Sequence, residues 1–180
     1  MKVVILNGSP RPKGNTRVLL ERMIAQLLKQ GHTAEVLTVS TMKLLPCLAC
    51  DGCSKNGGSC VRPDDSADAI QKVADADAVI FATPVYFWGV TAQLKLLLDK
   101  FYSRTSQFQQ MHKQVGLLTV GGAELTDPQY QLIETQFACI ADYFHWDLSF
   151  SLHFSAYEAG EVLNQPDVDR KLEAACRTLG

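Results

Sequence analysis

The chain has 180 residues, of which 47% are hydrophobic and 20% charged, and its formal net charge at pH 7 is -2. This composition is typical of one globular domain spanning residues 1–180, with a core large enough to fold alone. A nearly neutral chain argues against a nucleic-acid partner, no apolar run reaches the roughly 18 residues of a membrane span, and no signal-peptide pattern opens the sequence, so we expect a cytoplasmic protein without a membrane partner.

Apolar runs and amphipathic stretches alternate along the chain. The continuous apolar run 2–7 is typical of a strand buried on both faces, and an amphipathic helix pattern follows at 15–30. The alternation continues to the C-terminus. Further strands are predicted at 33–39, 77–83, 114–120 and 147–154, and further helices from a cap at Asp64 or Asp65 to 74, and at 91–103, 128–143 and 167–178.

Five strands that alternate with helices predict an α/β fold, in which helices cover both faces of a parallel sheet. The strand at 147–154 alternates apolar and polar residues, which is typical of an edge strand with one lightly covered face. Periodicity does not define the strand order. We expect the order 2-1-3-4-5, because it places the loops after the first and third strands on either side of a topological switch point, where ligands bind in such sheets.

The segment 7–16 joins the first strand to the first helix and has the features of a phosphate-binding loop. It leaves backbone N–H groups unpaired at the positive end of the helix dipole, although a simple capped turn is the alternative. Its polar side chains are Ser9, Arg11, Lys13, Asn15 and Thr16. The segment lacks the spacing of a P-loop and of a dinucleotide-binding loop, which favours a single terminal phosphate, as in a mononucleotide such as FMN.

Three aromatic residues follow the buried strand at 77–83, within the segment 84–89. Exposed aromatic side chains at this edge would be covered by a flat flavin ring, or else they pack on a neighbouring helix or a second subunit. Gly121 and Gly122, which follow the strand at 114–120, would let a third loop approach the same ligand without side chains.

These segments together resemble the flavodoxin-like NAD(P)H-dependent FMN reductase family over about the first 120 residues. The resemblance is carried by Gly8-Ser9-Pro10-Arg11, Gly14-Asn15-Thr16, Asp64-Asp65, Ala76-Asp77, Thr83 to Phe87 and Lys95 to Lys100. Lys100 is a departure, because such sequences often have arginine there. The resemblance implies a flavodoxin-like three-layer sandwich with bound FMN, and a nicotinamide donor that stacks on the exposed face of the ring.

The resemblance also assigns site residues. It implies that the FMN phosphate is bound by Ser9, Arg11, Gly14, Asn15 and Thr16, and the ring by Pro84, Val85, Tyr86, Phe87 and Trp88, with Gly121 and Gly122 beside it. Stacking geometry governs hydride transfer, so we predict no obligate catalytic side chain. Tyr86 is the polar group expected nearest to the ring, and a packing role is its alternative.

Six cysteines in a reducing compartment favour thiols or metal ligands over structural disulfides. Cys47, Cys50, Cys53 and Cys60 lie in an insertion loop at about 44–63, and their spacing resembles the motif that holds a [4Fe-4S] cluster in iron–sulfur flavoproteins. The alternatives are zinc, or metal-free thiols that line a pocket or form a reversible disulfide. We expect this loop at the same sheet edge as the flavin.

Cys139 and Cys176 lie in helical patterns and are predicted as small core residues, and the four histidines show no ligand spacing. The sequence therefore predicts an FMN-dependent enzyme that passes electrons from NAD(P)H to a small acceptor, such as a flavin, a quinone, or an azo or nitro compound. One alternative is an iron–sulfur flavoprotein that carries electrons between partners, and a second is a non-catalytic flavin-binding sensor. We expect a homodimer or higher homo-oligomer, because the aromatic loop needs cover.

Overall fold

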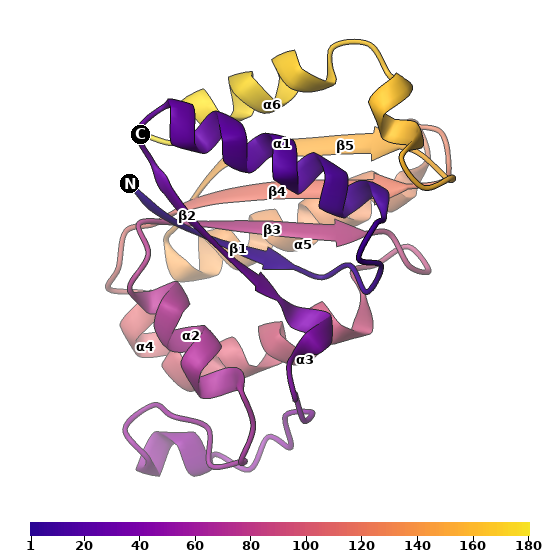
Figure 1. Cartoon of the computed structure of the whole chain (residues 1–180). Helices are drawn as coiled ribbons and strands as arrows, with labels where there is room; N and C mark the ends of the chain where they lie inside the picture. The colour runs from indigo at the N-terminus through magenta and orange to yellow at the C-terminus, as the bar shows by residue number, and fades with distance from the viewer.

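The computed structural model describes residues 1–180 and contains one parallel five-stranded sheet (Figure 1). Its strands are β1 (Lys2–Asn7), β2 (Thr33–Thr38), β3 (Ala78–Pro84), β4 (Gln114–Gly121) and β5 (Asp147–Ser155). They pair in the order β2-β1-β3-β4-β5, and every pairing is parallel. The predicted α/β class, strand order and edge position of β5 are confirmed.

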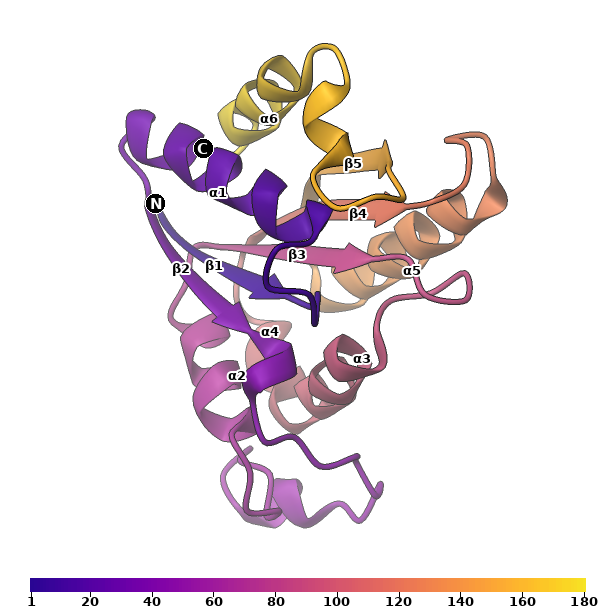
Figure 2. The same cartoon turned by 45° about the vertical axis from the view of Figure 1, so that its right-hand side comes forward.

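Helices cover both faces of the sheet and complete three layers (Figures 1 and 2). One face carries α1 (Asn15–Lys29) and α6 (Val168–Arg177), and the other carries α2 (Ser66–Ala74), α3 (Ala92–Asp99), α4 (Thr105–Phe108) and α5 (Pro128–Phe144). Short 3-10 turns lie at η1 (Val39–Thr41), η2 (Gly52–Lys55), η3 (Lys100–Arg104) and η4 (Glu161–Asn164). None of the helices combines the length and the apolar character needed to cross a membrane.

Two hydrophobic cores lie on opposite faces of the sheet and explain the continuous apolar strands. In β1, Val4 and Leu6 join the core beneath α2, α3 and α5, whereas Val3 and Ile5 join the core beneath α1 and α6. Successive side chains of a strand point to opposite faces, so a strand between two helix layers needs apolar residues at every position.

The helix predicted at 91–103 is divided in the structure. α-Helical hydrogen bonding ends at Asp99, and the 3-10 turn η3 follows. Lys100 and Phe101 are both buried there, each with 2% of its surface exposed. The buried position of Lys100 bears on the cysteine-rich segment described below.

The prediction that Cys139 is a core residue is wrong, whereas Cys176 is buried as predicted. The buried side of α5 carries Ile133, Phe137 and Ala141. Cys139 lies two residues after Phe137, about 200° around a helix of 3.6 residues per turn, and it therefore faces outward.

Candidate functional site

A cleft opens at the carboxyl end of the sheet and collects most of the predicted site residues. Its volume is about 190 Å³. Ten of the twelve predicted cofactor-binding residues line it: Ser9, Arg11, Gly14, Asn15, Thr16, Pro84, Val85, Tyr86, Gly121 and Gly122. Sites that enclose a drug-sized ligand measure roughly 300–1,000 Å³, so a mononucleotide bound here would extend beyond the cleft.

The loop between β1 and α1 is built to receive an anion. Its backbone is fixed by hydrogen bonds from Ser9 N to Asn7 Oδ1 (3.0 Å) and from Arg11 N to Ser9 Oγ (3.3 Å). No side chain caps α1, its first turn holds no acidic residue, and no group of the chain accepts from the N–H groups of residues 15–17. These free donors stand at the positive end of a 15-residue helix, where a phosphate is stabilised.

The side chain of Asn15 is already engaged by the chain itself. Its Nδ2 donates to Glu158 O (2.8 Å), and its Oδ1 accepts from Val162 N (3.4 Å). Asn15 therefore fixes the segment after β5 against the anion-binding loop, while its backbone N–H and the second N–H of its side-chain amide stay free for a ligand.

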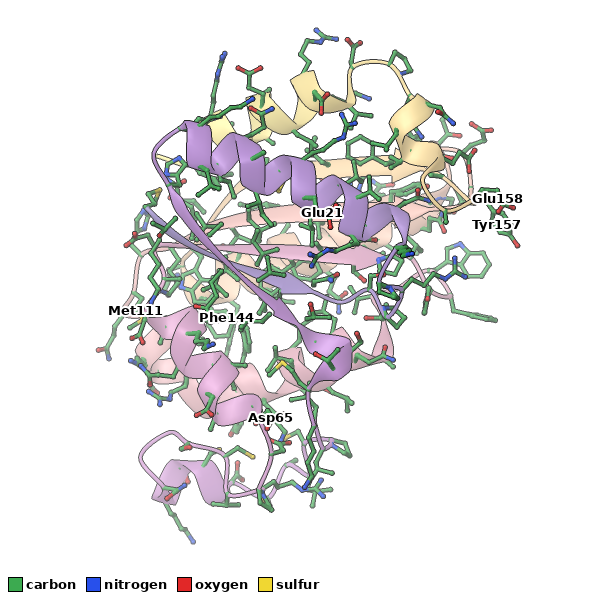
Figure 3. All side chains as sticks on the ribbon, viewed as in Figure 1. Glu21, Asp65, Met111, Phe144, Tyr157 and Glu158 are labelled. Carbon is green, nitrogen blue, oxygen red and sulfur yellow. The ribbon has the colours of Figure 1, made fainter.

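The segment after β5 forms a wall of the cleft that the sequence analysis missed. Ala156, Tyr157 and Ala159 line the cleft, and Figure 3 shows Tyr157 and Glu158 projecting from this segment beyond the end of the sheet. Glu161 Oε2 accepts hydrogen bonds from the backbone of Tyr157 (2.6 Å) and of Glu158 (2.8 Å). Parallel strands all end at one sheet edge, and that rule could have found this segment.

Gly122 makes room for Tyr157. A Cβ atom at Gly122 would lie 3.0 Å from Tyr157 Cδ2, closer than most Cβ contacts. The Tyr157 ring is 76% exposed. The lack of a side chain at Gly122 thus lets an exposed aromatic ring stand at the rim of the cleft.

The aromatic segment after β3 forms a two-residue hairpin. Tyr86 N donates to Gly89 O (2.9 Å) and Gly89 N donates to Tyr86 O (3.1 Å). Phe87 and Trp88 form the tip with φ values of 48° and 60°, a left-handed conformation that Asn and Gly favour in such turns. This conformation costs other residues roughly 1–2 kcal/mol each.

The tip of this hairpin is exposed and does not line the cleft. Phe87 is 97% exposed and Trp88 54%, and neither lines the cleft. The contact of Phe87 and Trp88 with a flavin ring stays a prediction. Such a contact would involve the part of the ligand that extends beyond the cleft. Tyr86 does line the cleft, and no acid–base pair accompanies it there.

The four clustered cysteines line a second cavity of about 30 Å³. Cys47, Cys50, Cys53 and Cys60 are free thiols, and Lys100, Tyr102 and Ser103 form part of the opposite wall. No three side chains of cysteine, histidine or acidic residues already converge as a metal site. Four thiols around one cavity are nevertheless a donor set that suits iron–sulfur clusters or zinc.

The cysteine-rich segment begins at the expected sheet edge and then leaves it. Ser40, in the turn after β2, donates from its Oγ to Ser9 O (3.3 Å), beside the anion-binding loop. The segment then runs below α2 and α3 (Figure 1), and its cavity shares no lining residue with the cleft. The eight residues of α3, roughly 12 Å of helix, lie between the two sites.

Together, the sheet order, the anion-binding helix terminus after β1 and the aromatic loop after β3 define a flavodoxin-like mononucleotide-binding protein. Residues 1–141 match the model of the family described as NADPH-dependent FMN reductase. The chain belongs to this family.

Three comparisons illustrate the relationship. An iron-sulfur flavoprotein of Methanocaldococcus jannaschii is 37% identical over 123 residues, which are 68% of this chain and 63% of that protein. YwqN of Bacillus subtilis, whose name describes a proposed NAD(P)H-dependent FMN-containing oxidoreductase, is 32% identical over 189 residues, with coverage of 99% and 97%. The solved structure of Trp repressor binding protein from Bacillus subtilis has a TM-score of 0.69 at 27% identity, covering 100% of this chain and 99% of that one.

The matches differ in how much of the relative they cover. The chain spans between 45% and 64% of the iron-sulfur flavoproteins that it matches, but nearly all of YwqN.

Proposed function

We propose that the chain is an oxidoreductase that binds FMN in the cleft, takes a hydride from NADH or NADPH, and passes electrons to a small acceptor such as a flavin, a quinone, or an azo or nitro compound. The observation that carries the proposal is the uncapped N-terminus of α1, which offers free N–H groups to an anion in the same cleft as Tyr86. When bound, FMN supplies the electron-transfer chemistry, and the protein supplies position and electrostatics.

The loop after β1 would hold the phosphate of FMN. The backbone N–H groups of residues 15–17 donate to it, Ser9 and Thr16 add hydroxyl groups, and Arg11 adds positive charge from the rim. Charge-assisted hydrogen bonds to such an anion are about twice as strong as neutral ones. Asn15 contributes its backbone N–H and keeps the opposite wall in place through its side chain.

The flavin ring would lie towards the other walls. Tyr86 and Tyr157 bring aromatic surface to the cleft, Gly121 lines it with backbone, and the lack of a side chain at Gly122 leaves room for the Tyr157 ring. Because the cleft does not enclose a whole mononucleotide, one face of the ring stays open to a nicotinamide. A second copy of the chain that covers the exposed tip of Phe87 and Trp88 would complete the site, and we propose a homodimer for this reason.

The phosphate assignment is tested by the substitution Arg11→Gln, with Arg22→Gln as the matched control. The Arg22 side chain pairs with Asp169 at 2.7 Å and does not line the cleft. We expect Arg11→Gln to weaken FMN binding about fivefold, which corresponds to about 1 kcal/mol. Arg22→Gln should leave the Kd for FMN unchanged. Equal affinities of the two variants would contradict the assignment.

A second candidate function rests on the cysteine cavity. We propose that Cys47, Cys50, Cys53 and Cys60 hold a [4Fe-4S] cluster, which makes the chain an iron–sulfur flavoprotein that carries electrons between partners. The support is that all four cysteines are among the residues that line one cavity, and that several relatives are named iron-sulfur flavoproteins. Anaerobic reconstitution followed by assays for iron and acid-labile sulfide tests it. FMN absorption bands without iron would exclude the cluster, and zinc found by metal analysis would identify the cavity as a zinc site instead.

Stopped-flow mixing with NADH or NADPH separates these functions from a non-catalytic flavin sensor. Rapid bleaching of bound FMN is expected for the oxidoreductase. A bound flavin that stays oxidised would indicate the sensor.

A further inference from the structure

The cysteine-rich segment depends on its two ends for its position. Residues 44–63 contain no strand and only the 3-10 turn η2. The ends are tied together where Asp64 Oδ2 accepts from Leu45 N (2.7 Å) and Asp65 Oδ2 accepts from Lys43 N (2.7 Å). Asp65 lies at the start of α2, just above this segment in Figure 3. These bonds hold the two ends of the loop close together, as in a compact surface loop.

Asp64 is the centre of this closure. Its side chain is fully buried and accepts hydrogen bonds from Leu45 N, from Ser66 N (3.0 Å) and from Ser66 Oγ (2.6 Å). It also pairs with Lys100 Nζ, and the Lys100 side chain is only 1% exposed. A buried ion pair holds its partners firmly, because removal of one charge leaves the other uncompensated.

Lys100 connects this closure to the cysteine cavity. It follows the last turn of α3 and lines the cavity that the four thiols share. The neighbouring Tyr102 donates from its Oη to Asp51 Oδ1 (3.0 Å), which adds a tie to the middle of the segment. The other end of α3 is fixed to the anion-binding loop, where Thr91 Oγ1 donates to Gly8 O (2.8 Å).

We propose that Lys100 is a positioning residue for the cysteine cavity: by its buried ion pair with Asp64 it holds the cysteine-rich segment so that its four cysteines line one cavity. The identity of the metal or cluster bound in this cavity depends on the proposed cluster function, whereas the positions of the four cysteines do not. Lys100 touches no reacting atom in this role.

Four variants test the proposal. Lys100→Met breaks the pair, and Lys100→Arg restores a cation with hydrogen-bond donors. The double variant Asp64→Asn/Lys100→Met removes both charges, so that no buried charge is left uncompensated should the single variant fail to fold. Lys95→Met is the matched control, because Lys95 forms a lysine–aspartate pair on the exposed side of α3.

The first readout is the alkylation rate of the half-buried Cys53 and Cys60 in the metal-free full chain, measured by mass spectrometry. We expect Lys100→Met, or the double variant, to raise it about tenfold, which corresponds to about 1.4 kcal/mol of loop opening. Lys100→Arg and Lys95→Met should match the wild type. Slow alkylation of the buried Cys176 and unchanged FMN affinity show that the variant is folded.

The second readout is Co²⁺ titration, followed by the thiolate-to-cobalt absorption band. We expect affinity to fall about tenfold in Lys100→Met and to return in Lys100→Arg. Unchanged alkylation of Cys53 and Cys60 in a folded variant would overturn the proposal. A wild-type chain that binds neither Co²⁺ nor an iron–sulfur cluster would instead overturn the cluster function, while the alkylation result still decides the role of Lys100.

Discussion

The hairpin tip gives the sharpest prediction on stability, through the double substitution Phe87→Asn/Trp88→Gly. Both residues adopt left-handed backbone with φ of 48° and 60°, at a cost of roughly 1–2 kcal/mol each. Phe87 is almost wholly exposed, whereas Trp88 is 54% exposed, so the replacement loses apolar burial at Trp88 worth roughly 1 kcal/mol. The larger conformational freedom of glycine in the unfolded chain offsets about 0.5–1 kcal/mol of the stability gained at Trp88.

We therefore expect the free energy of unfolding to rise by about 1–2 kcal/mol, and Tm to rise by about 2–4 °C for each kcal/mol in a chain of this size. If the tip contacts the part of FMN outside the cleft, FMN affinity and NAD(P)H turnover fall in the same variant. Strain kept at an exposed tip is expected where it serves a function.

Urea unfolding, thermal unfolding and FMN titration measure these effects. Tyr143→Asn is the control, because Tyr143 has the same exposed fraction as Trp88, 54%, but lies within the regular helix α5. It should not stabilise the chain. A loss of stability in the hairpin variant would refute the strain argument, and unchanged FMN affinity would refute the predicted ring contact of Phe87 and Trp88.

Three further predictions concern single residues. Burial raises the pKa of Asp64, but hydrogen bonds from Lys100, Ser66 and backbone N–H groups outweigh this effect and lower the pKa from 3.8 to about 2. The deprotonated carboxylate should therefore contribute about 2 kcal/mol to the free energy of unfolding above pH 4, and this contribution should be lost towards pH 2. Asp64→Asn should flatten this dependence in urea unfolding between pH 2 and 5. Gly122→Ala should displace Tyr157 and raise the Kd for FMN about tenfold, or about 1.4 kcal/mol, in fluorescence titration, whereas an unchanged Kd would place the ligand elsewhere. Burial raises the pKa of Cys176 to about 11, so iodoacetamide at pH 8 should modify it more slowly than the exposed Cys139 until the chain is unfolded.

The features that sequence could predict are those set by local patterns. Continuous apolar runs indicated buried strands, their alternation with helices indicated a parallel sheet, and the loop after β1 indicated an anion site. The cleft brings that loop together with Tyr86 and Gly121 because parallel strands deliver all their following loops to one edge. This is why loops far apart in the sequence could be predicted to meet.

Features that depend on contacts between distant segments were not predictable. The buried pair of Asp64 and Lys100 joins residues 36 positions apart, and the sequence showed Lys100 only as a departure from the family pattern, without its partner. The segment at 156–159 lies at the predictable sheet edge, but its hydrogen bonds to Asn15 join residues far apart in the sequence. The bond from the Asn15 side chain to Glu158 is a further contact of this kind, which no local pattern reveals.

Anaerobic titration of the purified full chain with FMN, followed by addition of NADH and NADPH, tests directly whether the chain is an FMN-dependent oxidoreductase. We predict one FMN per chain and rapid bleaching of its visible absorption by at least one of the two donors. We also predict that Arg11→Gln shifts the FMN titration to higher concentration. A chain that binds no FMN, or binds it with equal affinity in Arg11→Gln and leaves it oxidised, would contradict the proposed function.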